Sequence, residues 1–123
     1  MPQLSFTLDT YYELQNSSDD LKFDIVFGPE GQSPDFNVKL NGKVIKQHCK
    51  TSLFNEVIHN DEGLNDSILK IIGNICDVSK DSNELNLTLT VKGGITNYTK
   101  KFKVTVDEEG EEVDFALTLR FFI

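Results

Sequence analysis

Histidine and cysteine, the side chains that most often act as bases and nucleophiles, are rare in this sequence. His48 and Cys49 are neighbours, while His59 and Cys76 stand apart from them. Neighbouring side chains of a strand point to opposite faces, so His48 and Cys49 cannot form a catalytic dyad there. Metalloprotease, phosphate-loop and nucleophile-elbow motifs are absent, and no pattern pairs two carboxylates as glycoside hydrolysis requires. We therefore predict that the protein is not an enzyme.

Oxygen-bearing side chains at alternate positions suggest one possible metal site. Asp77, Ser79, Asp81 and Asn83 follow the spacing that opens a calcium-binding loop. The loop lacks the glycine expected at its sixth position, and Thr88 takes the place of the glutamate expected at its twelfth. Solvated turns account for the same residues. We expect no cofactor, and calcium at Asp77, Asp81 and Asn83 only if further ligands converge there.

An adjacent aromatic pair, Tyr11-Tyr12, is the first candidate for ligand binding. On a strand, one of the two rings must point away from the core. An outward ring offers a flat apolar surface to a ligand, although packing at a strand edge explains it equally well.

Three strands in the last third of the chain supply the second candidate. Apolar and polar residues alternate over 84–92, 98–106 and 113–121, a period that places one face of each strand in a core. We predict that these strands form an antiparallel meander, with Val91 opposite Tyr98 and Val106 opposite Val113. In that register the outer face collects Lys101, Lys103 and Arg120, which a solvated sheet face would explain. The alternative is a cationic surface that binds an acidic partner.

The rest of the chain also favours strands. Alternation or turn chemistry predicts strands over 4–9, 21–27, 36–40 and 43 to about 48, with Asn41-Gly42 as a hairpin turn. The segment 51–79 has two interpretations: strands at 54–58 and 69–75, which we favour, or a short helix. The predicted fold is therefore an all-β, two-sheet antiparallel sandwich of about eight strands, forming a single domain over 1–123.

The composition excludes several classes of partner. A net charge of -8 and a single arginine, Arg120, are unsuited to binding nucleic acid. The sequence shows no signal peptide and no apolar run long enough to span a bilayer. We therefore expect no nucleic-acid or membrane partner, cytoplasmic localisation by default, and two reduced thiols at Cys49 and Cys76.

Four short segments resemble a known family. Val38–Ile45 reads VKLNGKVI, and Phe54–Ile58, Glu62–Asn65 and Leu69–Ile71 follow it as FNEVI, EGLN and LKI. Their order resembles that of galactose-binding-like jelly rolls and related carbohydrate-binding modules, over about a third of the chain. The resemblance implies a jelly-roll sandwich and sugar binding, although this chain has no tryptophan to stack on a sugar ring.

From these observations we expect a non-catalytic binding module that recognises a glycan or protein partner through loops or one sheet face. The residues expected to carry binding are Tyr11, Tyr12, Lys101, Lys103 and Arg120. The alternative is a structural or assembly protein, either a component of a larger particle or a homo-oligomer. The oligomeric state is not predicted by the sequence.

Overall fold

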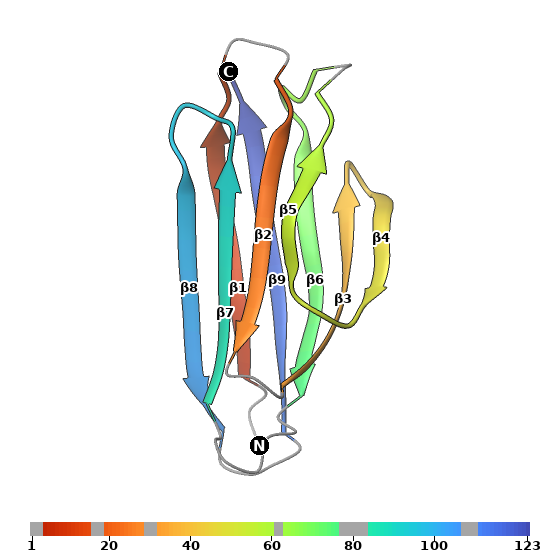
Figure 1. Cartoon of the computed structure of the whole chain (residues 1–123), viewed down its shortest axis with the longest axis vertical. Coiled ribbons are helices and arrows are strands. Elements are labelled where there is room, and N and C mark those ends of the chain that lie inside the picture. The colour runs from red at the N-terminus through yellow and green to blue at the C-terminus, as the bar shows by residue number, and fades with distance from the viewer. Residues whose placement is uncertain (1–3, 16–18, 29–31, 61–62, 77–83, 107–110) are drawn as a thin grey trace.

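A computed structural model of the chain describes residues 4–15, 19–28, 32–60, 63–76, 84–106 and 111–123. This part of the chain contains nine strands and no helix, so none of its elements could cross a bilayer as a helix (Figure 1). The strands are β1 (Leu4–Glu13), β2 (Leu21–Gly28), β3 (Ser33–Leu40), β4 (Lys43–Cys49), β5 (Leu53–Ile58), β6 (Ile68–Cys76), β7 (Glu84–Lys92), β8 (Tyr98–Thr105) and β9 (Glu112–Phe122).

The strands form a sandwich of two sheets. Five strands make one sheet in the order β1-β9-β6-β3-β4, and four make the other in the order β5-β2-β7-β8. All neighbours are antiparallel except β1 and β9, which run parallel in an unbroken register from the Leu4–Val113 pair to the Glu13–Phe122 pair. The predicted β-sandwich is thus confirmed, with one parallel pair that the sequence did not indicate.

Alternating apolar residues produce this fold because the strands other than the exposed edge strand β4 place one face between the sheets. In β7, Leu85, Leu87 and Leu89 are fully buried, while the residues between them are half-buried. Rings fill one part of the core: Phe27 lies 5.3 Å from Phe36 and 5.7 Å from Phe115, measured between ring centroids. Such dense aromatic burial is a large source of stability.

Two local predictions are confirmed. The ambiguous segment forms strands, β5 and β6, rather than the short helix considered as the alternative. Asn41 and Gly42 join β3 to β4 with φ angles of 53° and 81°, the positive values that a two-residue hairpin turn of type I′ requires. The turn residues therefore predict this hairpin, and hydrogen bonds between Asn41 and both Ser67 and Ile68 also hold the turn against the start of β6.

The predicted meander is only half correct. β7 and β8 pair in the expected register, with Val91 opposite Tyr98 and Leu87 opposite Phe102. β9 does not pair with β8; it crosses to the other sheet and lies between β1 and β6. Val113, Phe115 and Leu117 are buried as expected, but they do not face Val106, Val104 and Phe102. A period of two shows that a strand has a buried face, and either sheet of a sandwich can supply that face.

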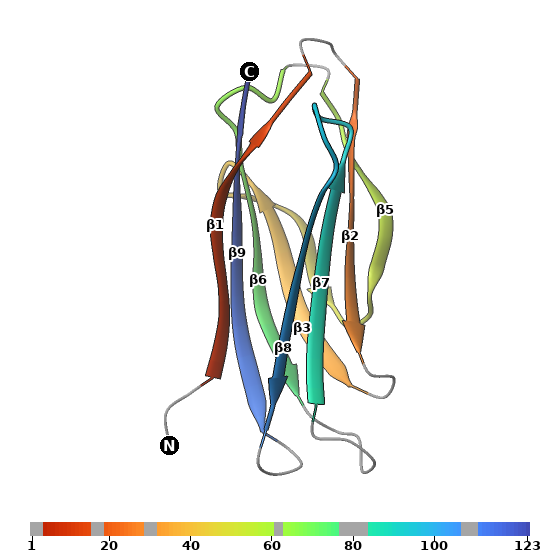
Figure 2. The ribbon, with the colours of Figure 1, turned by 90° about the vertical axis from the view of Figure 1, so that its left-hand side faces the viewer.

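The two open sides of the sandwich are closed differently. On one side the edges are β1 and β8 (Figure 2). There the rings of Phe6 and Phe102 stack with their centroids 5.1 Å apart. On the other side the edges are β4 and β5, where Lys46 Nζ lies 3.2 Å from Glu56 Oε2. One side is therefore held by apolar packing and the other by an ion pair between the sheets.

Candidate functional site

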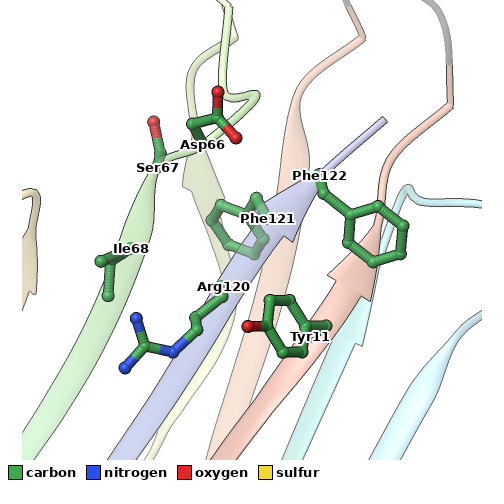
Figure 3. Close-up of a pocket in the computed structure, with 7 residues that line it drawn as sticks. All are labelled: Tyr11, Asp66, Ser67, Ile68, Arg120, Phe121 and Phe122. Atoms are coloured by element: carbon green, nitrogen blue, oxygen red, sulfur yellow. The ribbon is translucent and has the colours of Figure 1, made fainter.

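Two exposed aromatic residues, Tyr11 and Phe122, come together where β1 and β9 end. The parallel register places Tyr11 beside Arg120, and Arg120 in turn lies beside Ile68 of β6, all on the outer face of the five-stranded sheet. Phe122 follows on the same face, with its ring edge-on to Tyr11 at 6.0 Å between centroids. These side chains surround a shallow hollow of about 180 Å³ (Figure 3).

The burial of Tyr12 determines the face on which Tyr11 lies. The Tyr12 ring is buried, its hydroxyl accepts a hydrogen bond of 2.9 Å from Gly94 N, and it donates one of 3.3 Å to Val91 O. Burial raises the pKa of the Tyr12 hydroxyl above its usual value, and the bond from Gly94 opposes this. Because neighbours on a strand point apart, an inward Tyr12 forces Tyr11 outward, where it is 70% exposed. This confirms the prediction that one ring of the Tyr11-Tyr12 pair points away from the core.

Arg120 does not present a free positive charge at the hollow. Its Nε and a terminal nitrogen donate to the two carboxylate oxygens of Asp9, at 2.8 and 3.1 Å. The hydrogen bonds from Arg120 hold the pKa of Asp9 below its usual range, and the same bonds raise the pKa of Arg120. The two charges largely cancel, so the site as a whole favours neutral groups over anions.

The far rim of the hollow is a tight loop before β6. Asp66 adopts a positive φ of 66° and donates its N–H to Phe121 O at 3.0 Å, while Phe121 N donates to Ser67 O at 2.9 Å. Asn65 Oδ1 accepts from Ile123 N at 3.0 Å. These bonds fix the end of β9 against the loop, and Figure 3 shows Asp66 and Ser67 across the hollow from Tyr11.

The arrangement can hold a small polar ligand against an aromatic face. Tyr11 and Phe122 provide apolar surface, and the exposed Asp66 carboxylate accepts hydrogen bonds. Ser67 contributes less, because it is buried and its Oγ already accepts a hydrogen bond of 3.2 Å from Asn41 Nδ2. No family model, curated protein or solved structure matches this chain.

The predicted cationic face does not form. Lys101 and Lys103 lie on β8, whereas Arg120 lies on β9 in the opposite sheet. Lys103 Nζ is 3.2 Å from Glu84 Oε2, and both lysines border a separate hollow of about 300 Å³ with Thr88. The prediction was wrong because it required β9 to pair with β8. Of the five predicted binding residues, the structure brings together Tyr11 and Arg120 on the surface, with Tyr12 buried beneath.

The predicted calcium ligands Asp77, Asp81 and Asn83 lie outside the described residues. Within the described ranges, no group of three or more histidine, cysteine or acidic side chains is close enough to hold a metal ion. Cys49 and Cys76 are not joined in a disulfide, and burial raises the pKa of the Cys49 thiol.

Sequence reasoning predicted Tyr11 and Arg120 as binding residues but not the other residues that line the hollow, which are Asp66, Ser67, Ile68, Phe121 and Phe122. Phe121-Phe122 is a second adjacent aromatic pair, and the inward period of β9 could have identified Phe122 as the outward ring. Asp66 carried no such signal, because its position depends on bonds between the loop and β9. The pairing of Tyr11 with Arg120 spans nearly the whole chain and also lacked a local signal.

Proposed function

We propose that this domain is a non-catalytic binding module that takes a neutral glycan on the hollow beside Tyr11. The observation that carries the proposal is the Tyr11 ring, which is 70% exposed and lies on the outer face because its neighbour Tyr12 is buried. A sugar ring has an apolar face of C–H groups that packs on an aromatic ring, and hydroxyls that can bond to a carboxylate such as that of Asp66. The hollow offers both kinds of surface.

A neutral ligand fits better than an anionic one. Arg120 is engaged by Asp9 through two hydrogen bonds, and the protein carries a net charge of -8. An anionic glycan would have to compete with Asp9 for Arg120 and approach against the overall charge. The resemblance of segments in 38–71 to galactose-binding-like modules supports testing hexoses first.

Binding rather than cleavage is proposed because the hollow offers too few acid and base groups. Among the described residues that line it, Asp66 alone carries a carboxylate. Glycoside hydrolysis ordinarily needs two carboxyl groups about 5–10 Å apart across the scissile bond.

The proposal is tested by measuring the binding of a glycan panel to the unaltered protein and to two variants. The panel contains neutral hexoses and their short oligomers, with sulfated and sialylated glycans as anionic members. Tyr11→Ala should weaken binding of a neutral member at least about tenfold, which corresponds to about 1.4 kcal/mol of lost contact. The matched control is Phe54→Ala, because Phe54 is also a strongly exposed ring, 63%, but lies on β5 of the other sheet.

Salt separates the neutral from the anionic interpretation. Binding of a neutral glycan should be unchanged between low salt and about 0.5 M salt, since few charges are involved. The proposal fails if no neutral member binds, if Phe54→Ala weakens binding as much as Tyr11→Ala, or if only anionic members bind.

A further inference from the structure

The edge strands of the two sheets differ in how well they are protected against pairing with another strand. β4 has extra residues at two points of its register with β3, and β5 has one such bulge against β2. β8 carries three lysines close together, Lys100, Lys101 and Lys103. Bulges and lysines are the usual means by which edges resist added strands. β1 has neither: its ten residues pair with β9 without interruption and include no lysine or proline.

The backbone of β1 directs half of its polar groups away from β9. Leu14 N donates to Phe122 O at 2.7 Å, whereas Glu13 O accepts from Ile95 N at 3.0 Å on the opposite side. Successive residues of a strand alternate in this direction, so the even-numbered residues of β1 bond to β9. Ser5, Thr7, Asp9 and Tyr11 accordingly present their N–H and C=O groups to the open side. Among the described strands, none pairs with β1 there.

Another segment of the same chain pairs with the end of this edge. Leu14 forms an antiparallel bridge with Gly94, next to the Ile95–Glu13 bond, in the loop that joins β7 to β8. The chain then turns away, and β8 pairs with β7 in the other sheet (Figure 2). The end of the β1 edge thus already accepts an antiparallel partner, while the stretch from Ser5 to Tyr11 is left without one among the described strands.

The side chains that flank this stretch define what would fit. Phe102 stacks on Phe6 of β1, yet Phe102, Val104 and Tyr98 of β8 remain only half-buried on their core-facing side. Lys100 lies among them, exposed, with its Nζ 5.7 Å from the centre of the Phe102 ring. A strand added beside β1 would bring its inward side chains alongside these groups. Apolar residues would cover the rings, and a carboxylate would pair with Lys100.

We propose that the β1 edge from Ser5 to Tyr11 binds an extended segment of a partner polypeptide as an antiparallel strand. Its inward residues are apolar, with one acidic residue facing Lys100. The partner is a polypeptide because only a backbone supplies donors and acceptors at the spacing of the strand edge. This interaction is separate from the glycan site, which uses the Tyr11 ring on the outer face of the sheet.

A peptide titration followed by amide exchange tests the proposal. The probe is an acetylated synthetic peptide long enough to cover Ser5 to Tyr11, alternating valine with threonine or lysine, with glutamate in the central inward position. It should slow exchange of the Thr7 and Asp9 amides and leave the amides of β4 unchanged. Thr7→Pro removes an N–H directed at the edge without removing a bond to β9, and should weaken the peptide at least about tenfold. Thr7→Ala keeps that N–H and serves as the matched control.

A charge exchange gives a second test that does not depend on the folding of Thr7→Pro. Lys100→Glu should bind the glutamate peptide less tightly and a peptide with central lysine more tightly, reversing the preference of the unaltered protein. Tyr11→Ala should retain the peptide even where it loses the glycan, so the two proposals fail separately. The strand-addition proposal is overturned if no peptide binds at about 1 mM, if protection appears away from β1 and β8, or if Lys100→Glu leaves the preference unchanged.

Discussion

β1 and β4 border the same five-stranded sheet, yet they contribute to the molecule in opposite ways. β1 buries Phe6 and Tyr12, and the chain just beyond it buries Leu14. Every residue of β4 before Cys49 is exposed, including Val44 and Ile45 at 43% each. Figure 1 shows β4 as the outermost strand on its side of the sandwich. The difference shows that an apolar residue on a strand contributes to the core only where the other sheet lies across from it.

The contacts between the sheets differ in the same way at the β1 edge and at the β4 edge. At β1, Phe6 can stack on Phe102 because β8 supplies an aromatic partner, and the contact removes apolar surface from water. At β4, Lys46 meets Glu56 with side chains that remain 42% and 25% exposed. Exposed ion pairs contribute little to stability. We therefore expect the side chains of β1 to contribute strongly to the free energy of unfolding and those of β4 to contribute little.

The comparison is tested most strongly by truncating one apolar side chain on each strand. Phe6→Ala should lower the free energy of unfolding by about 3 kcal/mol or more, because it leaves a cavity next to Phe102. Val44→Ala should change it by less than about 0.5 kcal/mol, since Val44 contributes little buried area. Urea unfolding of both variants measures the difference. Comparable losses would show that β4 is packed more tightly than its exposure indicates.

The sequence predicted the local part of this fold well and the long-range part poorly. The Asn41-Gly42 turn and the β7–β8 register follow from turn residues and from alternation across a short loop. The position of β9 depends on a parallel partner, β1, at the other end of the chain. Alternation is identical for a strand in either sheet, so no pattern in 112–122 could distinguish the two placements.

The same limit applies to the candidate site. That one ring of Tyr11-Tyr12 must face outward followed from strand geometry alone. The predicted cationic face failed because it combined Lys101 and Lys103 with Arg120 across a pairing that does not exist. Arg120 instead meets Asp9, a residue with no sequence signal linking it to β9. A site assembled from two distant strands is predictable only when their register is known.

A smaller effect is expected from the hydroxyl that anchors the end of β1. Tyr12→Phe removes the acceptor of the Gly94 N–H in a buried setting, and should cost about 1–3 kcal/mol for an unsatisfied donor. Tyr11→Phe, on the exposed neighbour, should stay within about 0.5 kcal/mol. Thermal and urea unfolding give the energies, and faster exchange of the Gly94 amide would locate the loss. Equal behaviour of the two variants would mean that the hydroxyl of Tyr12 is not an anchor.

A still smaller effect is expected from the ion pair that borders β4. A double-mutant cycle with Lys46→Met and Glu56→Gln should give a coupling energy below about 1 kcal/mol, because both side chains are partly exposed. Methionine preserves most of the apolar stem of lysine, so the cycle isolates the charge. The coupling should shrink in about 1 M salt. A coupling energy above about 2 kcal/mol that does not fall in high salt would contradict this. It would mean that the ion pair stabilises the β4 side of the sandwich as strongly as a buried contact.

The smallest effects concern two carboxylates, one on each side of the comparison. Hydrogen bonds from Arg120 hold the pKa of Asp9 below its usual value, and a hydrogen bond from Lys50 does the same for Asp35 of β3. A depressed pKa means that each pair stabilises the fold above the unfolded pKa of about 3.9, and that this contribution is lost as the pH falls through the folded pKa. Carboxyl NMR titrations should show Arg120→Gln raising the pKa of Asp9 alone and Lys50→Gln raising that of Asp35 alone. If either variant moved both pKa values, the charges on the two sides of the sheet would be coupled. The two sides would then differ in how their side chains pack and would not differ in their electrostatics.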